Sequence, residues 1–159
     1  MAGVPIYRTA VAAQWIDYNG HLRDAYYGLI VSFAIDALME RIGVDAAYRE
    51  RTGCTIYTLE LHLHFLREIK GDDTVAVGLR VLGADHKRIH AAFELYREPQ
   101  IEPAATAEAM LLHVQQRGAQ VASTAFPPAV AAAIDALRQT SAQLTAGGPG
   151  SRQMQLSPR

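Results

Sequence analysis

The feature that most constrains this chain of 159 residues is one long apolar segment near its N-terminus. From Asp24 to Ile42 the sequence reads DAYYGLIVSFAIDALMERI, and Gly43 follows it. Because glycine commonly follows the last residue of a helix and aspartate is a suitable N-cap, we expect a helix that starts with Asp24 and stops at Gly43. A helix this apolar is expected to be buried on nearly all sides. Its polar or small residues form one narrow stripe: Asp24, Gly28, Ser32, Asp36 and Glu40.

Most of the remaining chain has the pattern of β-strands. Val4 to Ala13 is rich in β-forming residues, and four further runs alternate apolar and polar side chains. The four runs are Thr55–Leu66, Thr74–Leu82, Arg88–Arg97 and Thr106–Gln115, the last being ambiguous with helix because it is rich in alanine. Short loops join them, so neighbouring strands are expected to pair as antiparallel meanders. The predicted fold class is α+β, with a five-stranded antiparallel sheet wrapped around the long helix.

The other segments predict a single domain. Val44 to Gly53 fits a short helix or turn, and Ala129 to Arg138 fits a short helix after the break at Pro127-Pro128. From Thr140 onward the sequence is small, polar and low in hydrophobic residues, which is typical of a disordered tail. We therefore expect one domain over residues 1–139 and a tail over residues 140–159.

The sequence gives no sign of a nucleic-acid partner or of a membrane segment, and its cysteine content favours a reducing compartment. The formal net charge is −1, so there is no basic excess to neutralise the phosphates of a nucleic acid. No apolar run approaches the ~20 residues that cross a bilayer, and the N-terminus lacks the layout of a signal peptide. Cys54 is the single cysteine and has no disulfide partner within the chain, which predicts a cytoplasmic protein.

A polar loop from Trp15 to Arg23 precedes the long helix and contains side chains suited to chemistry. Asn19-Gly20 marks a turn within it. The first backbone N–H groups of a helix lack partners and can polarise a bound carbonyl group or anion. We therefore expect the active site at this loop.

The loop also carries a family resemblance. DYNGHLRDAYY, from Asp17 to Tyr27, resembles the signature of hotdog-fold acyl-CoA thioesterases of the 4-hydroxybenzoyl-CoA thioesterase type, in which Asp-x-x-Gly-[His/Ile]-[Val/Leu] precedes the central helix. Strand order and spacing agree from about Val4 to Pro128. LHFLREIKGDDTV, ADHKRIHAAFELY and ATAEAMLLHV are similar to stretches of betainyl-CoA thioesterases, a subgroup linked to carnitine and betaine catabolism. The resemblance implies a hotdog fold and hydrolysis of a small or medium acyl-CoA, with betainyl-CoA preferred.

The resemblance also implies catalytic roles. Asp17 matches the catalytic carboxylate, acting either as nucleophile on the thioester carbonyl or as general base for a water molecule. The backbone N–H of Asp24 matches the group that polarises the carbonyl. Arg23 departs from the asparagine of many relatives, and the negative side chain of Asp24 suggests selection of a cationic acyl group such as a trimethylammonium. Thiolate is a good leaving group, so neither a metal nor a cofactor is expected.

Neighbouring residues are assigned to substrate binding. His21 is expected to orient Asp17 or line the pocket, or alternatively to cap backbone groups of the loop. Tyr18 and Asn19 are expected to shape the pocket or only to form the turn.

Coenzyme A needs cations for its phosphates. Lys87 and Arg88 match a basic cluster that contacts the nucleotide in the resembled family, and Arg67 is a further candidate, although basic residues in a turn are often only solvated.

The strand from Thr55 to Leu66 suggests an assembly. Tyr57, Leu59, Leu61, Leu63 and Phe65 are expected on one face, with Thr58, Glu60, His62 and His64 on the other. This second face also includes a leucine at the end of the strand, Leu66, and such a half-apolar face suggests a subunit interface, so we expect a homodimer or homotetramer.

Four alternatives remain open from the sequence. Asp36, within the helix, would need a partner or a raised pKa and is a second candidate for the carboxylate or the substrate pocket. A hotdog hydratase or dehydratase has its histidine five residues after the aspartate, whereas His21 lies four after Asp17. An acyl-CoA-binding protein without activity is the third alternative. His62 and His64 share a strand face and could chelate a metal, but no third ligand stands near them in sequence.

Overall fold

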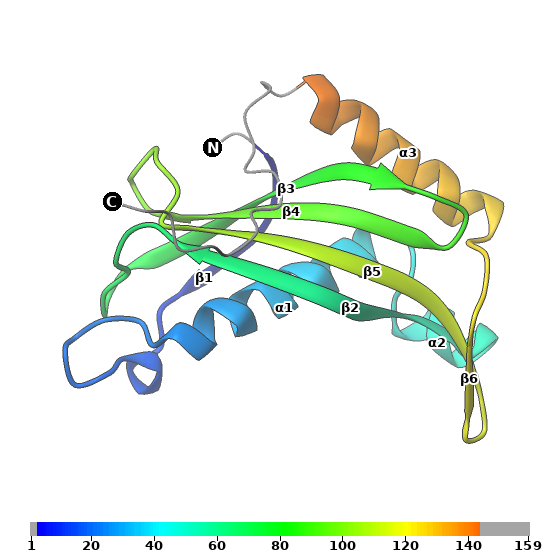
Figure 1. Cartoon of the computed structure of the whole chain (residues 1–159), viewed down its shortest axis with the longest axis horizontal. Coiled ribbons are helices and arrows are strands. Elements are labelled where there is room, and N and C mark those ends of the chain that lie inside the picture. The colour runs from blue at the N-terminus through cyan, green and yellow to red at the C-terminus, as the bar shows by residue number, and fades with distance from the viewer. Residues whose placement is uncertain (1–2, 144–159) are drawn as a thin grey trace, which may run out of the picture.

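The computed structural model of the protein describes residues 3–143, which form an antiparallel sheet and three α-helices (Figure 1). The strands lie in the order β1-β3-β4-β5-β2, and β6 pairs with the end of β5. The expected α+β class and its antiparallel strand pairing are confirmed. The strands are β1 (Val4–Ala10), β2 (Cys54–Phe65), β3 (Thr74–Ala84), β4 (Arg88–Arg97), β5 (Ala105–Arg117) and β6 (Gln120–Ser123).

The expectation of five strands is wrong, because the described part of the chain contains six. The additional strand, β6, has four exposed residues and follows a tight turn at Gly118, where φ is +60°. It pairs with Val114–Arg117 of β5, beyond the point where β4 begins. With four residues, of which Val121 is the single large apolar one, the segment is too short to carry an alternating pattern, so the strand has no clear signal in the sequence. The first strand is also shorter than expected, since a 3-10 turn (Ala13–Trp15) follows it.

The long helix, α1 (Asp24–Arg41), packs on one face of the sheet (Figure 1). It ends at the expected place, with Gly43 in the left-handed region at φ +80°. Its buried side chains share a core with residues of β3, β4 and β5. They are Tyr27, Ile30, Val31, Ala34, Ile35 and Leu38.

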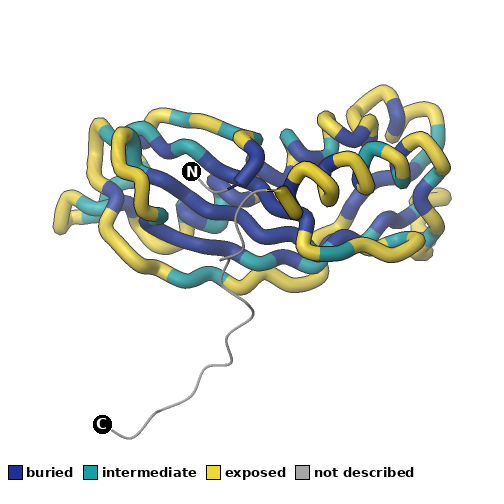
Figure 2. The backbone as a smooth tube through the Cα atoms, turned by 90° about the horizontal axis from the view of Figure 1, so that it is seen from above, coloured by how far each residue is buried: buried dark blue, intermediate teal, exposed yellow. Residues whose placement is uncertain are grey.

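Burial of α1 on nearly all sides is not observed within one chain. Asp24, Ser32, Asp36 and Glu40 are exposed, so the polar stripe faces outward. The middle of the sheet, by contrast, is largely buried (Figure 2). The reason is geometric: one sheet covers one side of a helix, and the helix is packed on that side alone. The argument that Asp36 is buried in the helix and needs a partner therefore fails, since the residue is exposed.

β2 is an edge strand whose alternation is interrupted. The register with β5 shifts between Thr58 and Glu60, which is a β-bulge. As a result Tyr57 pairs with Leu112, on the face of the sheet away from α1, and the predicted single face from Tyr57 to Phe65 is wrong. The strand exposes several large apolar side chains: Tyr57, Leu59, Leu61 and Phe65, followed by Leu66.

Two hydrogen bonds from side chains lie near the opposite edge of the sheet, where β1 is the outermost strand. In β1, Pro5 has no N–H to donate, and Arg41 Nη1 donates to its carbonyl oxygen at 3.3 Å. Beyond β1, the N–H of Val81 in β3 donates to Ser141 Oγ at 3.1 Å. Ser141 belongs to α3 (Pro128–Gln143), which packs along β3. Side chains therefore occupy two hydrogen-bonding groups of the backbone on this side of the sheet.

The helix α3 is longer than predicted, because it continues through Thr140 to Gln143. The predicted tail is therefore wrong for residues 140–143, and its remainder, residues 144–159, lies outside the described residues. The short helix expected in 44–53 is present as α2 (Ala46–Thr52), capped by Asp45 and ended by Gly53. No helix within residues 3–143 is long and apolar enough to cross a membrane.

Candidate active site

The polar loop before α1 is a small hairpin. Ile16 and Leu22 pair as a β-bridge, the N–H of Asp17 donates to the carbonyl oxygen of His21 at 2.9 Å, and that of Gly20 donates to the carbonyl oxygen of Asp17 at 3.1 Å. Gly20 has φ +81°, which suits a glycine and closes the turn. The hairpin places Asp17 directly opposite His21.

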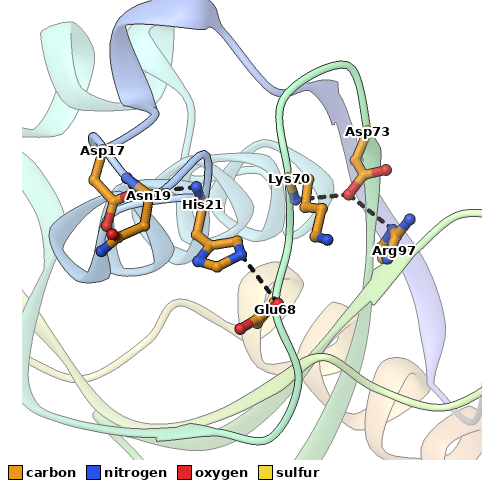
Figure 3. Close-up of polar contacts among 7 residues, drawn as sticks. All are labelled: Asp17, Asn19, His21, Glu68, Lys70, Asp73 and Arg97. Carbon is orange, nitrogen blue, oxygen red and sulfur yellow. Dashed lines mark hydrogen bonds and ion pairs between the residues drawn. The ribbon is translucent and has the colours of Figure 1, made fainter.

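The carboxylate of Asp17 is held by backbone groups of this hairpin (Figure 3). Its Oδ1 accepts the N–H of Asn19 at 2.8 Å and that of His21 at 3.1 Å. The hydrogen bond from His21 is the main cause that lowers the pKa of Asp17 below its ordinary value. Desolvation opposes it, and the bond from Asn19 lowers the pKa further. None of the hydrogen bonds found within residues 3–143 reaches Oδ2. Asp17 therefore presents an ionised carboxylate with one oxygen unoccupied.

The start of α1 supplies a free donor beside this loop. Arg23, not Asp24, is the N-cap, and no side chain caps the helix, so the predicted cap is wrong. Asp24 is the first helical residue, and its carboxylate accepts the N–H of Ala25 at 2.8 Å. The N–H of Tyr26 donates to the carbonyl oxygen of Arg23 at 3.0 Å. The N–H of Asp24 is left without an acceptor among the described residues, as expected for the first turn of a helix.

Glu68 is a site residue for which the sequence pattern gives no sign. Leu22 and His21 pair with the segment just before β3: the N–H of Leu22 donates to the carbonyl oxygen of Ile69 at 2.7 Å, and His21 and Lys70 form a β-bridge. This pairing brings Glu68 Oε2 to 3.0 Å from His21 Nε2. The two residues lie 47 positions apart, so only the family stretch LHFLREIKGDDTV pointed to this segment.

A second carboxylate holds the turn that carries Glu68 (Figure 3). Asp73 Oδ2 accepts the backbone N–H of Lys70 at 2.7 Å and lies 2.8 Å from Arg97 Nε of β4. The turn between β2 and β3 is therefore tied to the sheet on one side and to the Asp17 hairpin on the other.

The three predicted substrate-binding residues are placed differently with respect to Asp17. Asn19 contributes its backbone N–H to Asp17, and its side chain makes no hydrogen bond within the described chain. Tyr18, at the tip of the hairpin, is 96% exposed. Asp36 lies 12 residues beyond Asp24 on α1, which is about 18 Å at 1.5 Å per residue, so the structure does not bring it to the site.

The basic candidates are divided between the two ends of the sheet. Arg67 is next to Glu68, where its Nη1 donates to the carbonyl oxygen of Pro103 at 3.1 Å and its Nη2 pairs with Glu102. Lys87 and Arg88 lie after β3, whose 11 residues span about 36 Å from the Asp17 end (Figure 1). Within one chain the structure therefore does not bring them to Asp17.

The face of the sheet away from α1 holds a half-open cavity of about 190 Å³ with histidines in it. His90 Nε2 contacts Glu108 Oε1, and His62 lies 3.9 Å from Glu60. His64 pairs with Thr106 and does not line this cavity. Within residues 3–143, no three His, Cys, Asp or Glu side chains are grouped as metal ligands.

Comparison with known proteins gives this geometry a family. Residues 11–134 match the model of the thioesterase-like superfamily. A betainyl-CoA thioesterase from Pseudomonas aeruginosa is 44% identical over 133 residues, which cover 84% of this chain and 82% of that protein.

Solved structures agree over the whole chain. A Pseudomonas putida KT2440 protein assigned as a thioesterase has a TM-score of 0.86 at 38% identity, covering 99% of both chains. A Staphylococcus aureus protein solved in complex with CoA has a TM-score of 0.87 at 27% identity, covering 99% of this chain and 98% of that one. Sequence, strand order and central helix agree, and the chain belongs to the thioesterase-like superfamily, with its hotdog fold.

Proposed function

We propose that this protein hydrolyses an acyl-CoA thioester to the free acid and coenzyme A, with betainyl-CoA as the preferred substrate. The observation that carries the proposal is the presence of two complementary groups at this loop. One is the ionised carboxylate of Asp17, which has a free oxygen, and the other is the unoccupied N–H of Asp24 at the start of α1. The family supports the reaction, and the 44% identical relative supports the acyl group.

The chemistry needs only these two groups at the reacting carbon. The carbonyl oxygen of the thioester accepts the N–H of Asp24, which stabilises the charge that develops on it. Asp17 Oδ2 then attacks the carbon, or removes a proton from a water molecule that attacks it. The thiolate leaves with the electrons of the C–S bond. No cofactor or metal takes part in this scheme, and activity is expected to persist in EDTA.

The acidic side chains at the helix start favour a cationic acyl group. Asp24 is exposed beside its own N–H, and Glu68 lies on the far side of His21. We expect Asp24→Asn to lower activity on betainyl-CoA more than on a neutral acyl-CoA of similar size, because only the first loses a favourable charge. Equal losses on both substrates would show that the charge of Asp24 does not select the cationic acyl group.

A second copy of the chain completes the proposed site. β2 exposes apolar side chains along an unpaired edge, and two antiparallel copies joined there would set the start of one β2 beside the end of the other. Lys87 and Arg88 of the second copy would then approach the first copy's Asp17 end, where they are available for CoA phosphates. The assembly is a homodimer or a homotetramer built from such pairs.

Mixing two defective variants tests this arrangement. Asp17→Asn lacks the carboxylate, and the double variant Lys87→Glu, Arg88→Glu lacks the cations. If the two sets come from different chains, a mixed pair contains one intact site, and co-expression should raise activity above that of either variant alone. If one chain supplies both, mixing restores nothing. Light scattering of Leu59→Lys, Leu61→Lys checks that the β2 edge is the contact.

The function itself is tested by thiol release from short-chain, aromatic and betainyl thioesters. We expect betainyl-CoA to be hydrolysed fastest, and Asp17→Asn to be nearly inactive. Turnover unchanged in that variant would remove the catalytic role from Asp17. Binding without turnover would identify an acyl-CoA-binding protein, and hydration of an enoyl-CoA would identify a hydratase. A cytoplasmic location, where the buried thiol of Cys54 stays reduced, belongs to the same proposal.

A further inference from the structure

We propose that Glu68 is a positioning residue that fixes the tautomer of His21, and that His21 Nδ1 is the general base for the water that releases the acyl group from Asp17. The inference rests on the proposed thioester hydrolysis and deepens it, because it gives Asp17 the role of nucleophile and assigns proton transfer to a different residue.

The ion pair determines which nitrogen of His21 carries a proton. Glu68 Oε2 lies 3.0 Å from His21 Nε2, and an ionised carboxylate can only accept a hydrogen bond. Nε2 must therefore be the donor, so in the neutral ring the lone pair is on Nδ1. No hydrogen bond within residues 3–143 occupies Nδ1, and the side chain is 31% exposed, which leaves it open to a water molecule.

The backbone on both sides of the pair is fixed, which distinguishes it from an ordinary surface contact. His21 and Leu22 pair with Lys70 and Ile69 as short strands. On the far side, Asp73 holds the N–H of Lys70 and the guanidinium of Arg97. Glu68 therefore projects from a turn that is fixed at both ends, and its partner projects from the hairpin that holds Asp17. Figure 3 shows this series of contacts from Asp17 to Arg97.

The two acid–base groups of the site are suited to different steps. Backbone hydrogen bonds lower the pKa of Asp17, which makes its carboxylate a weaker base while leaving Oδ2 free to attack. A water molecule still has to lose a proton during hydrolysis. His21 lies directly opposite Asp17 in the hairpin, because its backbone N–H donates to Asp17 Oδ1 at 3.1 Å, and its ring projects from this position.

The complete reaction then has two balanced steps. In the first, Asp17 Oδ2 bonds to the thioester carbon and the thiolate leaves with the C–S electron pair, giving a mixed anhydride. In the second, the oxygen of water bonds to the acyl carbon, Nδ1 takes one proton of that water, and the carboxylate of Asp17 leaves. The imidazolium of His21 then gives this proton to the coenzyme A thiolate, and the acid product ionises.

Glu68→Ala tests the positioning role, with Glu68→Gln as the rescue and Glu102→Ala as the control. Glu102 is 65% exposed against 63% for Glu68, and it pairs with Arg67, not with His21. General bases contribute about 100-fold or more, so losing control of the tautomer should cost at least about tenfold in kcat with KM little changed. Glutamine keeps an acceptor for Nε2–H and should recover most of the rate. A similar loss in Glu102→Ala would show that removing either carboxylate disturbs the loop, and this result would overturn the proposal.

Nitrogen-15 NMR of the histidine rings reads the tautomer without any substrate, with His21→Gln to assign the signals. We expect the Nε2–H form of His21 in the native protein and a mixture of forms in Glu68→Ala. An unchanged tautomer would overturn the role of Glu68. If the native protein hydrolyses no thioester, the proposed function fails, while this measurement still decides whether Glu68 fixes the ring.

The kinetics of His21→Gln separate the two chemical steps. Attack by Asp17 should remain fast and the water step should become slow. We therefore expect a burst of free thiol close to one per site, and a protein mass increased by the acyl group after rapid quenching. Slow thiol release without a burst would show that His21 is not the base of the second step.

Discussion

Asp17 and Asp85 lie at opposite ends of β3, and each begins a turn by accepting backbone hydrogen bonds. Asp17 Oδ1 accepts the N–H groups of Asn19 and His21, whereas Asp85 Oδ1 accepts those of Lys87 and Arg88 at 2.9 and 2.7 Å. The pKa of both carboxyl groups is lowered. The main cause is the backbone N–H of His21 for Asp17 and that of Lys87 for Asp85. The second oxygen differs: Asp85 Oδ2 accepts Arg88 Nε at 2.8 Å, and Asp17 Oδ2 is unoccupied.

The comparison shows that the turn alone does not make an aspartate reactive. Both turns hold an ionised carboxylate in one orientation, but the guanidinium of Arg88 uses the remaining oxygen of Asp85. Asp17 instead has the start of α1 and the ring of His21 as neighbours. We expect the carboxylate of Asp85 only to support its turn, whereas that of Asp17 is proposed to react. The following variants test this difference, from the largest expected effect to the smallest.

Asp17→Asn should give the largest effect. The amide oxygen can still accept the N–H groups of Asn19 and His21, so the hairpin remains, but the nucleophilic charge is lost. We expect kcat to fall by about two orders of magnitude or more, which is about 2.7 kcal/mol of activation free energy. Thiol release measures the loss, and circular dichroism confirms the fold. A variant that keeps a third of its activity would contradict the assignment.

Gly20→Ala should reduce activity less, through the shape of the hairpin. An alanine at φ +81° is strained by roughly 1–2 kcal/mol, enough to move Asp17 and His21 out of register and lower kcat about tenfold. Gly118→Ala is the matched control, because φ is +60° there and the turn lies between β5 and β6. Equal kinetic losses in the two variants would mean that general instability, not the hairpin, is measured.

Asp85→Asn should leave kcat within about twofold and reduce stability instead. Because the folded-state pKa of Asp85 lies below its value in the unfolded chain, its stabilisation is fully present above about pH 4 and is lost as the pH falls through the folded pKa. The difference in urea midpoint between the native protein and the variant should therefore be constant from pH 7 to 5 and shrink in stronger acid. A difference in urea midpoint that grows in acid would contradict a lowered folded-state pKa for Asp85.

Lys87→Ala should give the smallest effect, at the far end of the same turn. An exposed cation contributes about 0.2–1 kcal/mol to an ion pair, so KM for a CoA thioester should rise about two- to fivefold with kcat unchanged. The same substitution should leave KM unchanged for a thioester of pantetheine, which lacks the nucleotide. Equal changes for both substrates would place Lys87 outside the phosphate contacts.

Local patterns predicted the parts of the molecule that depend on neighbours in sequence. The end of α1 at Gly43, the bounds of β4 and the turn at Asn19-Gly20 all follow from residue preferences a few positions wide. The bulge in β2 was not predicted, because a register shift depends on the partner strand and leaves the sequence pattern almost intact.

The candidate site was predictable only in part, for the same reason. The family signature pointed to Asp17 and to the N–H of Asp24, and helix geometry pointed to the start of the helix in general. The contact of His21 with Glu68 depends on pairing between segments that meet only in the fold, and the distance of Lys87 from Asp17 depends on the length of β3. Neither can be obtained from the spacing of residues along the chain.

The unequal edges of the sheet limit how far strand-by-strand growth can proceed. Pro5 and Ser141 stand at one edge, where a missing donor and an occupied N–H deny hydrogen bonds to an incoming strand, while β2 at the other edge is unpaired. In the proposed pair, the β2 edges of both copies are used, and each copy presents only its β1 edge to the surroundings. No β2 edge would then remain for a third molecule, so growth by pairing of β2 would end at two copies.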